Sequence, residues 1–223
     1  MLSYPIAVAS MWQRDRLCRH LDPRRVHIIP NESGGDATVP WSGGDGQTLR
    51  YLGHTLWYKG IDVAIEALRR LRSVRPELRL KVASSIVDRD LVRALARVPG
   101  VTVRGEVDAA EFIAGADLLL LPLRKSSGTN VYPNVLIEAM AAGAPLLTSA
   151  LPAHRELLGA ATATCTVENY DPAIWADRVD ALLAESAARQ RIGANLRARA
   201  DELWEASAID RRWTAFIAAI EAL

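Results

Sequence analysis

Lys59 stands in a loop whose residue types could bind an anion. The loop runs from Gly53 to Gly60, after a strand predicted over residues 48–52 and before a predicted helix. A lysine offers a compact, mobile positive charge that suits a diphosphate, and Gly60 would allow close approach to the backbone. A solvated lysine beside a helix-start glycine explains this loop equally simply, and the loop taken alone favours that second interpretation.

A second loop, residues 122–134, leads into a helix predicted over residues 135–143. Free backbone N–H groups at a helix start form an anion site, and Pro133 stands where its missing N–H costs little. Glu138 follows Asn134 by four positions, so both share one helix face and Glu138 could accept hydrogen bonds from neighbouring hydroxyls. A surface glutamate is the alternative, but its apolar neighbours make a purely solvated role less probable.

A third loop, residues 104–107, follows a strand predicted over residues 101–103. Gly105 has no side chain, so the backbone there could lie along the edge of a flat base. A simple turn between a strand and a helix explains the same residues.

The elements that must position these loops alternate along the chain. Apolar runs alternate with segments of helical periodicity, which predicts a parallel α/β sheet. The run Leu118–Leu121 indicates a strand buried on both faces, as in a doubly wound sheet. Ligands of such sheets bind beyond the carboxyl ends of the strands, where all three loops lie. The other strands are expected over residues 48–52, 78–83, 101–103 and 146–148, and helices over residues 61–71 and 91–98.

The main domain is predicted over residues 48–200. Residues 1–33 have too little apolar sequence for a core of their own and are interpreted as the remnant of another domain. Residues 34–47, rich in Gly, Ser, Asp and Pro, are expected to form an unpacked linker. Residues 201–223 form a helix whose apolar stripe needs a partner surface and is expected to pack toward the N-terminal domain; that stripe comprises Ile209, Trp213, Phe216, Ile220 and Leu223.

The composition argues against several kinds of partner. The sequence has 27 Lys and Arg against 26 Asp and Glu, a net charge of +1, so no nucleic acid is expected. Cys18 and Cys165 fit no metal spacing and no disulfide scaffold. Neither a signal peptide nor a membrane-spanning apolar run is visible, so a cytoplasmic setting is expected, with peripheral contact to a membrane left open.

Together the three loops resemble the carboxyl-terminal domain of family-4-type retaining glycosyltransferases of the GT-B fold, and the resemblance extends over nearly the whole chain. That domain has two sequence signatures. The first is a loop in which Gly and Arg are followed, after a spacer, by Lys-Gly. The second is a Glu, then seven residues, then Glu-Ala-Met, a Gly and a Pro, and a further glutamate stands after the next loop. The matching positions are Gly53, His54 and Lys59–Gly60, then Asn130 through Glu138, Gly143 and Pro145, then Glu156; residues 8–15 and 26–31 resemble the end of the first domain and its crossover.

The resemblance implies a Rossmann-like donor domain for a nucleoside-diphosphate sugar, with no metal or other cofactor. It implies retaining transfer of a hexose-type sugar to an acceptor sugar, lipid or other small molecule, with an acceptor-binding partner domain. The implied contacts are His54, Lys59, Asn134 and Val135 with the diphosphate, Glu138 with the ribose, Val107 with the base, and Gly128, Thr129 and Asn130 with the donor sugar.

Two departures from the family pattern leave alternatives open. His54 replaces an arginine, so a permanent cation becomes a side chain that is charged only part of the time near neutral pH. Asn130 replaces a glutamate and cannot offset positive charge developing on the sugar. A different donor sugar or a decayed site would explain both changes. The alternatives are therefore a non-catalytic nucleotide-sugar-binding or interaction module, or an epimerase or sugar phosphorylase on the same architecture.

Overall fold

The computed structural model describes residues 4–31, 39–85, 89–125 and 131–222. Its strands are β1 Ile6–Val8, β2 Val26–Ile28, β3 Thr48–Leu52, β4 Arg79–Ala83, β5 Val101–Arg104, β6 Leu118–Leu121, β7 Leu146–Ser149 and β8 Thr166–Val167. Its α-helices are α1 Met11–Leu17, α2 Ile61–Leu71, α3 Arg89–Ala96, α4 Ala109–Ala114, α5 Asn134–Ala142, α6 Pro152–Leu158, α7 Thr162–Cys165, α8 Pro172–Ala184, α9 Ser186–Leu203 and α10 Ala206–Glu221. Short 3₁₀ helices are η1 Pro23–Arg25, η3 Trp57–Lys59 and η4 Gly159–Ala161.

The main sheet has six parallel strands in the order β5-β4-β3-β6-β7-β8, and β1 and β2 form a separate parallel pair. From β3 the chain steps outward to β4 and β5, then returns to place β6 on the other side of β3. This reversal of direction is the doubly wound, Rossmann-like order. The predicted fold class is confirmed.

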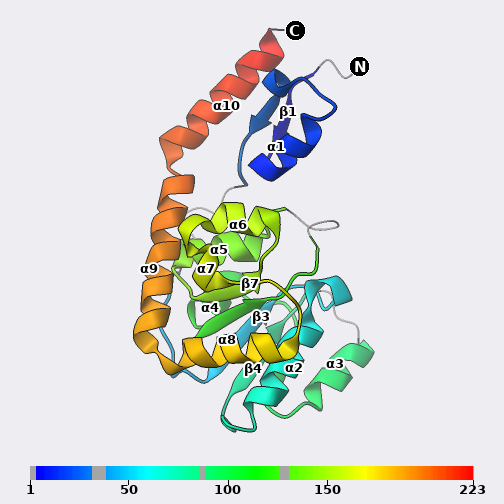
Figure 1. The fold of residues 1–223 in the computed structure, drawn as a ribbon, viewed down its shortest axis with the longest axis vertical. Coiled ribbons are helices and arrows are strands. Elements are labelled where there is room, and N and C mark those ends of the chain that lie inside the picture. The colour runs from blue at the N-terminus through cyan, green and yellow to red at the C-terminus, as the bar shows by residue number, and fades with distance from the viewer. Residues whose placement is uncertain (1–3, 32–38, 86–88, 126–130, 223) are drawn as a thin grey trace.

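The sheet separates two apolar layers. Leu118 and Leu120 of β6 pack in one layer with α2 and α8, whereas Leu119 and Leu121 pack in the other with α5 and α9. Successive residues of a strand point to opposite faces, so four consecutive leucines can all be buried. The predicted burial of this strand on both faces is confirmed. In Figure 1, α8 crosses the lower end of the molecule and α9 runs along one side.

The helix α1 runs from Met11 to Leu17. Cys18 caps it, and Asp22 then caps η1 by accepting a hydrogen bond from the Arg24 N–H at 3.0 Å. The proline at position 23 disfavours a helical conformation of Asp22 and so favours a new start.

The described part of the predicted linker, residues 39–47, is held to the main domain by specific hydrogen bonds. The Trp41 indole donates to the Ala116 carbonyl at 2.7 Å, and the Trp41 N–H donates to the Ala142 carbonyl at 2.8 Å. The buried carboxylate of Asp117 accepts from three consecutive N–H groups, those of residues 46–48, at 2.9 to 3.1 Å. The expectation of an unpacked segment is therefore wrong for residues 39–47. The division into domains stays a prediction.

The N-terminal unit β1-α1-β2 lies beside α10, at the end of the molecule away from α8 (Figure 1). The rings of His27 and Phe216 meet edge to face with centroids 5.4 Å apart, and the Trp204 indole donates to the Asn31 carbonyl at 2.6 Å. Of the apolar stripe on α10, Ile209 is buried but Trp213 is 44% exposed. Ile220 is equally exposed, and Leu223 lies outside the described residues.

Glu156 joins this unit to the main domain. Its carboxylate accepts hydrogen bonds from the Met11 and Trp12 N–H groups at 2.6 and 2.9 Å and from the Tyr132 hydroxyl at 2.8 Å. A carboxylate at a helix N-terminus satisfies amides that have no partner within the helix. Glu156 thus caps α1 in this structure.

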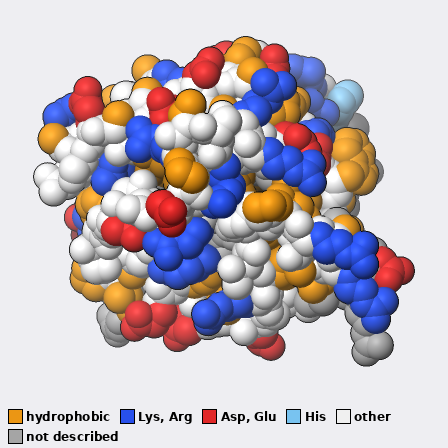
Figure 2. Space-filling model, turned by 90° about the horizontal axis from the view of Figure 1, so that it is seen from below, with side chains coloured by type: hydrophobic (Ala, Val, Ile, Leu, Met, Phe, Trp, Pro, Cys, Tyr) orange, Lys and Arg blue, Asp and Glu red, His pale blue; other side chains and the backbone are white. Residues whose placement is uncertain are grey.

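Two features of the described residues bear on membrane crossing and on metal binding. No helix there is both long enough and apolar enough to cross a bilayer. No group of three or more His, Cys, Asp or Glu side chains there is arranged to hold a metal ion. On the face shown in Figure 2, Lys and Arg side chains are interspersed with Asp and Glu.

Candidate functional site

A cavity of about 350 Å³ lies where the strand order reverses, beyond the carboxyl ends of β3 and β6. The connections that leave these neighbouring strands run to opposite faces of the sheet, which opens a crevice between them. We call this cavity the crevice. Five of the residues predicted to bind a ligand line it: His54, Lys59, Asn134, Val135 and Glu138.

Tyr51 anchors the loop after β3 to the sheet through hydrogen bonds to two of the loop's carbonyls. Its ring is buried in the sheet core, and its hydroxyl donates to the His54 carbonyl at 2.9 Å and to the Lys59 carbonyl at 3.4 Å. Burial raises the pKa of Tyr51 well above its ordinary value, so the hydroxyl stays protonated and remains a donor. Sequence reasoning assigned Tyr51 no role. A tyrosine at the end of a strand, directly before a candidate ligand loop, is the signal that could have identified it.

Gly60 has a conformation and a neighbour that together require glycine. Its φ is +75°, and a Cβ added there would lie 2.0 Å from the Pro122 carbonyl oxygen. The sequence predicted a close backbone approach at this residue. The group that approaches is the chain after β6, so Gly60 brings the two loops of the crevice together.

Arg124 fastens the same two loops at their outer side. Its backbone N–H donates to the Tyr58 carbonyl at 2.8 Å, and its guanidinium donates to the Trp57 carbonyl at 2.6 Å. The guanidinium also makes two parallel bonds to the Asp62 carboxylate at 2.7 and 2.6 Å, and this interaction lowers the pKa of Asp62. A bidentate pair fixes geometry as well as contributing energy. Sequence reasoning assigned Arg124 no role.

The start of α5 lines the crevice, and no side chain of the described residues caps it. Pro133 is the N-cap residue and has no side-chain oxygen to accept from the first amides. Its carbonyl accepts from the Leu136 and Ile137 N–H groups at 2.9 and 3.2 Å, which lie deeper in the helix. This first turn, at Asn134 and Val135, is where the sequence predicts an anion site.

Lys59 and Glu138 bring opposite charges into this cavity. Both side chains are half-buried, and burial lowers the pKa of Lys59 and raises the pKa of Glu138. Within the described ranges, the Glu138 carboxylate has no hydrogen-bond or ion-pair partner. An unpaired, half-buried carboxylate costs free energy that a ligand hydroxyl could offset.

His154 lies beneath the crevice and is almost completely buried. Its Nδ1 lies 3.0 Å from the Thr148 hydroxyl oxygen and 3.1 Å from the Ser149 carbonyl oxygen. Burial lowers its pKa to about 4, and the positive charge of Lys59 adds to this effect. His154 is therefore neutral at neutral pH. Its partner Thr148, on β7, donates a hydrogen bond to the carbonyl of Leu121, which lines the crevice.

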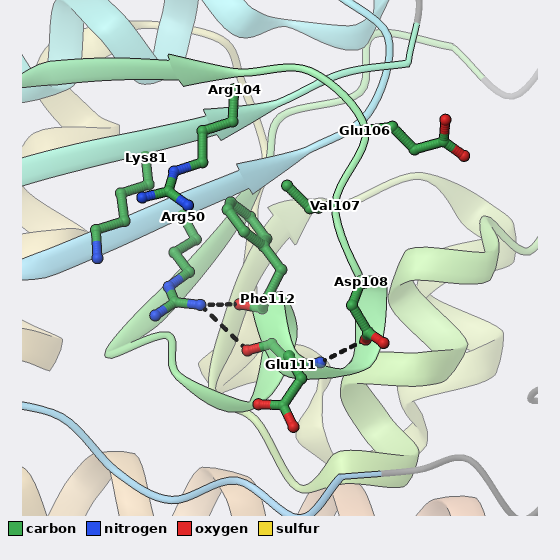
Figure 3. A pocket seen from close by; sticks show the side chains of 8 residues that line it. All are labelled: Arg50, Lys81, Arg104, Glu106, Val107, Asp108, Glu111 and Phe112. Atoms are coloured by element: carbon green, nitrogen blue, oxygen red, sulfur yellow. Dashed lines mark hydrogen bonds between the residues drawn. The ribbon is translucent and has the colours of Figure 1, made fainter.

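The remaining predicted site residues lie elsewhere. Val107 lines a second cavity of about 390 Å³, which we call the strand-face pocket. This pocket lies against β3, β4 and β5 (Figure 3), and Asp108 of this pocket is followed in sequence by Ala109, which lines the crevice. Its lining is Arg50, Lys81, Arg104, Glu106, Val107, Asp108, Glu111 and Phe112. Gly128, Thr129 and Asn130 lie outside the described residues.

The crevice thus combines a lysine, helix-start amides and an unpaired carboxylate in a space that suits one small molecule. The amides and the lysine can hold phosphate oxygens, and the carboxylate can accept from hydroxyl groups. A phosphorylated molecule that also carries hydroxyls would match both halves of the cavity.

Comparison with known proteins places this geometry in a family. Residues 46–185 match the family described as Glycosyl transferases group 1. A D-inositol 3-phosphate glycosyltransferase from Xylanimonas cellulosilytica is 30% identical over 165 residues, which are 69% of this chain and 38% of that protein.

Solved structures agree on the fold. WaaG, a glycosyltransferase involved in lipopolysaccharide biosynthesis, has a TM-score of 0.76 and 25% identity, covering 97% of this chain and 63% of WaaG. TarM from S. aureus, as a mutant solved with Fondaparinux, alpha-GlcNAc-glycerol and UDP, has a TM-score of 0.78 and 15% identity, covering 95% of this chain and 43% of TarM.

This chain spans less than two thirds of the length of each of these three proteins. The structural neighbours have the GT-B fold, which confirms the architecture implied by the resemblance. The family match covers the crevice and all five predicted residues that line it. The chain therefore belongs to the Glycosyl transferases group 1 family.

Proposed function

We propose that the crevice binds a nucleoside-diphosphate sugar and that the chain is the donor-binding domain of a retaining glycosyltransferase. The observation that carries this proposal is the unpaired carboxylate of Glu138 in the same cavity as Lys59 and the uncapped start of α5. This combination matches the hydroxyl and phosphate groups of one nucleotide.

Lys59, His54 and the amides of Asn134 and Val135 hold the diphosphate in this proposal. As the bond between the sugar and the diphosphate breaks, negative charge grows on the departing phosphate. Positive side chains and helix amides fixed around it therefore stabilise the transition state more than the bound substrate. We propose that these groups act without a metal ion.

Glu138 accepts hydrogen bonds from the ribose hydroxyls, and the backbone at Val107 borders the base. Val107 lies in the loop before α4, and Ala109, the first residue of α4, lines the crevice. The presence of UDP in the TarM structure supports a nucleoside diphosphate as the ligand class. The resemblance assigns Gly128, Thr129 and Asn130 to the donor sugar, which we propose to be a hexose.

The acceptor site belongs to a second domain in this proposal. The acceptor is a sugar, a lipid or another small molecule, and the transfer retains the anomeric configuration, as in the enzymes that the chain resembles. The relative from Xylanimonas cellulosilytica supports this view, because the matched region is 38% of that glycosyltransferase.

Calorimetric titration with UDP, GDP and ADP in metal-free buffer tests the donor assignment. One nucleotide is expected to bind. Glu138→Gln is expected to weaken the ribonucleotide more than its deoxyribose analogue. No binding of any nucleotide, or equal effects on both sugars, would contradict the assignment.

A nucleotide-sugar-binding module that does not transfer sugar is the second candidate, and His54 in place of the family's arginine favours it. Adding a separately expressed acceptor domain distinguishes the two. Transfer of labelled sugar supports the enzyme, whereas nucleotide binding without transfer supports the module.

A further inference from the structure

Three basic side chains gather on one face of the main sheet. Arg50 of β3 pairs with Lys81 of β4, and Lys81 pairs with Thr102, two residues before Arg104 on β5. Residues two apart on a strand share a face, and neighbouring strands lie about 4.8 Å apart. The three side chains therefore come within reach of one another, as Figure 3 shows.

No apolar layer covers this part of the sheet. The core cluster on the α4 side of the sheet contains no residue of β4 or β5 among the described residues. The helix α4 has only six residues and contacts β3. The strand-face pocket, about 390 Å³ in volume, occupies the place where a longer helix would pack.

Carboxylates at the rim do not neutralise these cations. In the described part of the chain, none of Arg50, Lys81 and Arg104 forms an ion pair. Asp108 instead caps α4 by accepting from the Glu111 N–H at 3.0 Å. Figure 3 shows the Glu106 carboxylate pointing away from the three basic groups.

Arg50 is held in place at the base of the pocket. Its guanidinium lies 5.0 Å from the centre of the Phe112 ring and donates to the Phe112 and Glu111 carbonyls. Its Nε is buried and has no hydrogen-bond partner among the residues that the structure describes. Gly115 leaves room for this arrangement, because a Cβ there would lie 2.4 Å from the Arg50 Nη2.

We propose that the strand-face pocket is a phosphate-binding site in which Arg50, Lys81 and Arg104 hold a single phosphate group. Two guanidinium groups and one ammonium group supply charge-assisted donors from three directions, and phosphate is the common anion that accepts from all of them. The site lies outside the crevice and does not depend on the donor assignment.

The electrostatics of Lys81 support this proposal. Burial lowers its pKa, and the positive charges of Arg50 and Arg104 lower it further. A bound phosphate would remove that repulsion and restore the preference of Lys81 for its charged form.

Titration with inorganic phosphate tests the site. The titration uses the Lys59→Ala variant as the background, because this change is expected to weaken phosphate binding in the crevice. This variant is expected to bind phosphate saturably, and adding Lys81→Ala or Arg104→Ala is expected to reduce the affinity at least about tenfold. Both side chains reach solvent, so neither change threatens folding.

Arg79→Ala is the matched control. Arg79 lies two residues from Lys81 on the same strand face, but it pairs with Asp45 and does not line the pocket. Its removal is expected to leave phosphate affinity unchanged. Absence of saturable phosphate binding would overturn the proposal, and so would an affinity in the Lys81→Ala and Arg104→Ala variants equal to that of the Lys59→Ala background.

A second arm identifies the source of the phosphate, using phosphatidylcholine vesicles with and without phosphatidic acid. In one outcome, the protein sediments with vesicles that contain phosphatidic acid, and both Lys81→Ala and added inorganic phosphate prevent this. That result would support the site and assign it a lipid phosphate. Saturable binding of inorganic phosphate without sedimentation would support the site and assign it a soluble phosphate. Sedimentation that Lys81→Ala leaves unchanged, without binding of inorganic phosphate, would overturn it.

Discussion

The crevice and the strand-face pocket both present positive side chains, yet they are built differently. In the crevice, loops after β3 and β6 position Lys59, and Tyr51, Gly60 and Arg124 fix those loops through backbone contacts. In the strand-face pocket, the cations stand on the strands themselves, and the strand register brings them together. A site built from loops can be altered without disturbing the sheet, whereas a site built from strands is tied to the sheet register.

The largest expected effect is at Gly60. Gly60→Ala adds a Cβ 2.0 Å from the Pro122 carbonyl oxygen at a φ of +75°, so it should lower the free energy of unfolding by more than about 3 kcal/mol. Gly105→Ala is the control beside the strand-face pocket, where a Cβ would meet nothing within 4 Å. Urea denaturation measures both, and similar stabilities of the two variants would break the comparison.

The next effect is the acid sensitivity of the crevice floor. His154 has a pKa of about 4 in the folded chain against an ordinary value of 6.5, so the unfolded chain binds the proton more readily. The contribution to stability is fully present above pH 6.5 and is lost as pH falls toward 4, by about 3 kcal/mol in total.

His154→Gln should remove this part of the pH dependence, whereas the same change at the exposed His20 should not. Urea denaturation at pH 7, 6 and 5 measures the difference in free energy of unfolding between each variant and the parent chain. A difference for His154→Gln that stays constant over this range would contradict the buried neutral histidine.

Tyr51 should give the smallest effect. Tyr51→Phe removes the hydroxyl that donates to the His54 carbonyl, and is expected to cost about 1 kcal/mol of stability and to weaken nucleotide binding. Tyr58→Phe, in the same loop, is the control, because the described residues offer its hydroxyl no hydrogen bond. Equal nucleotide affinity in both variants would show that Tyr51 does not position the loop.

The sequence predicts the crevice better than the strand-face pocket for a physical reason. Lys59, Asn134 and Glu138 stand in segments where turn residues and helix starts mark positions that face a ligand. Arg50 and Lys81 stand inside strands, and their meeting depends on strand order and on the short α4, neither of which a local pattern specifies.

The same reasoning explains why the prediction of an unpacked linker was wrong for residues 39–47. The Gly, Ser and Asp content of residues 34–47 is typical of an unpacked segment, but the contacts that hold residues 39–47 come from Ala116, Asp117 and Ala142, which are distant in sequence. The alternation of the leucines in β6 could be predicted, because burial on both faces is a property of the strand itself.

Titration of the nucleotide that binds the parent chain into two lysine variants tests the central claim most directly. Lys59→Ala should lower its affinity at least about tenfold, because a cation next to the diphosphate is lost, while Lys81→Ala in the strand-face pocket should leave it unchanged. An unchanged affinity in Lys59→Ala, or an equal loss in both variants, would contradict the assignment of the crevice as the donor site.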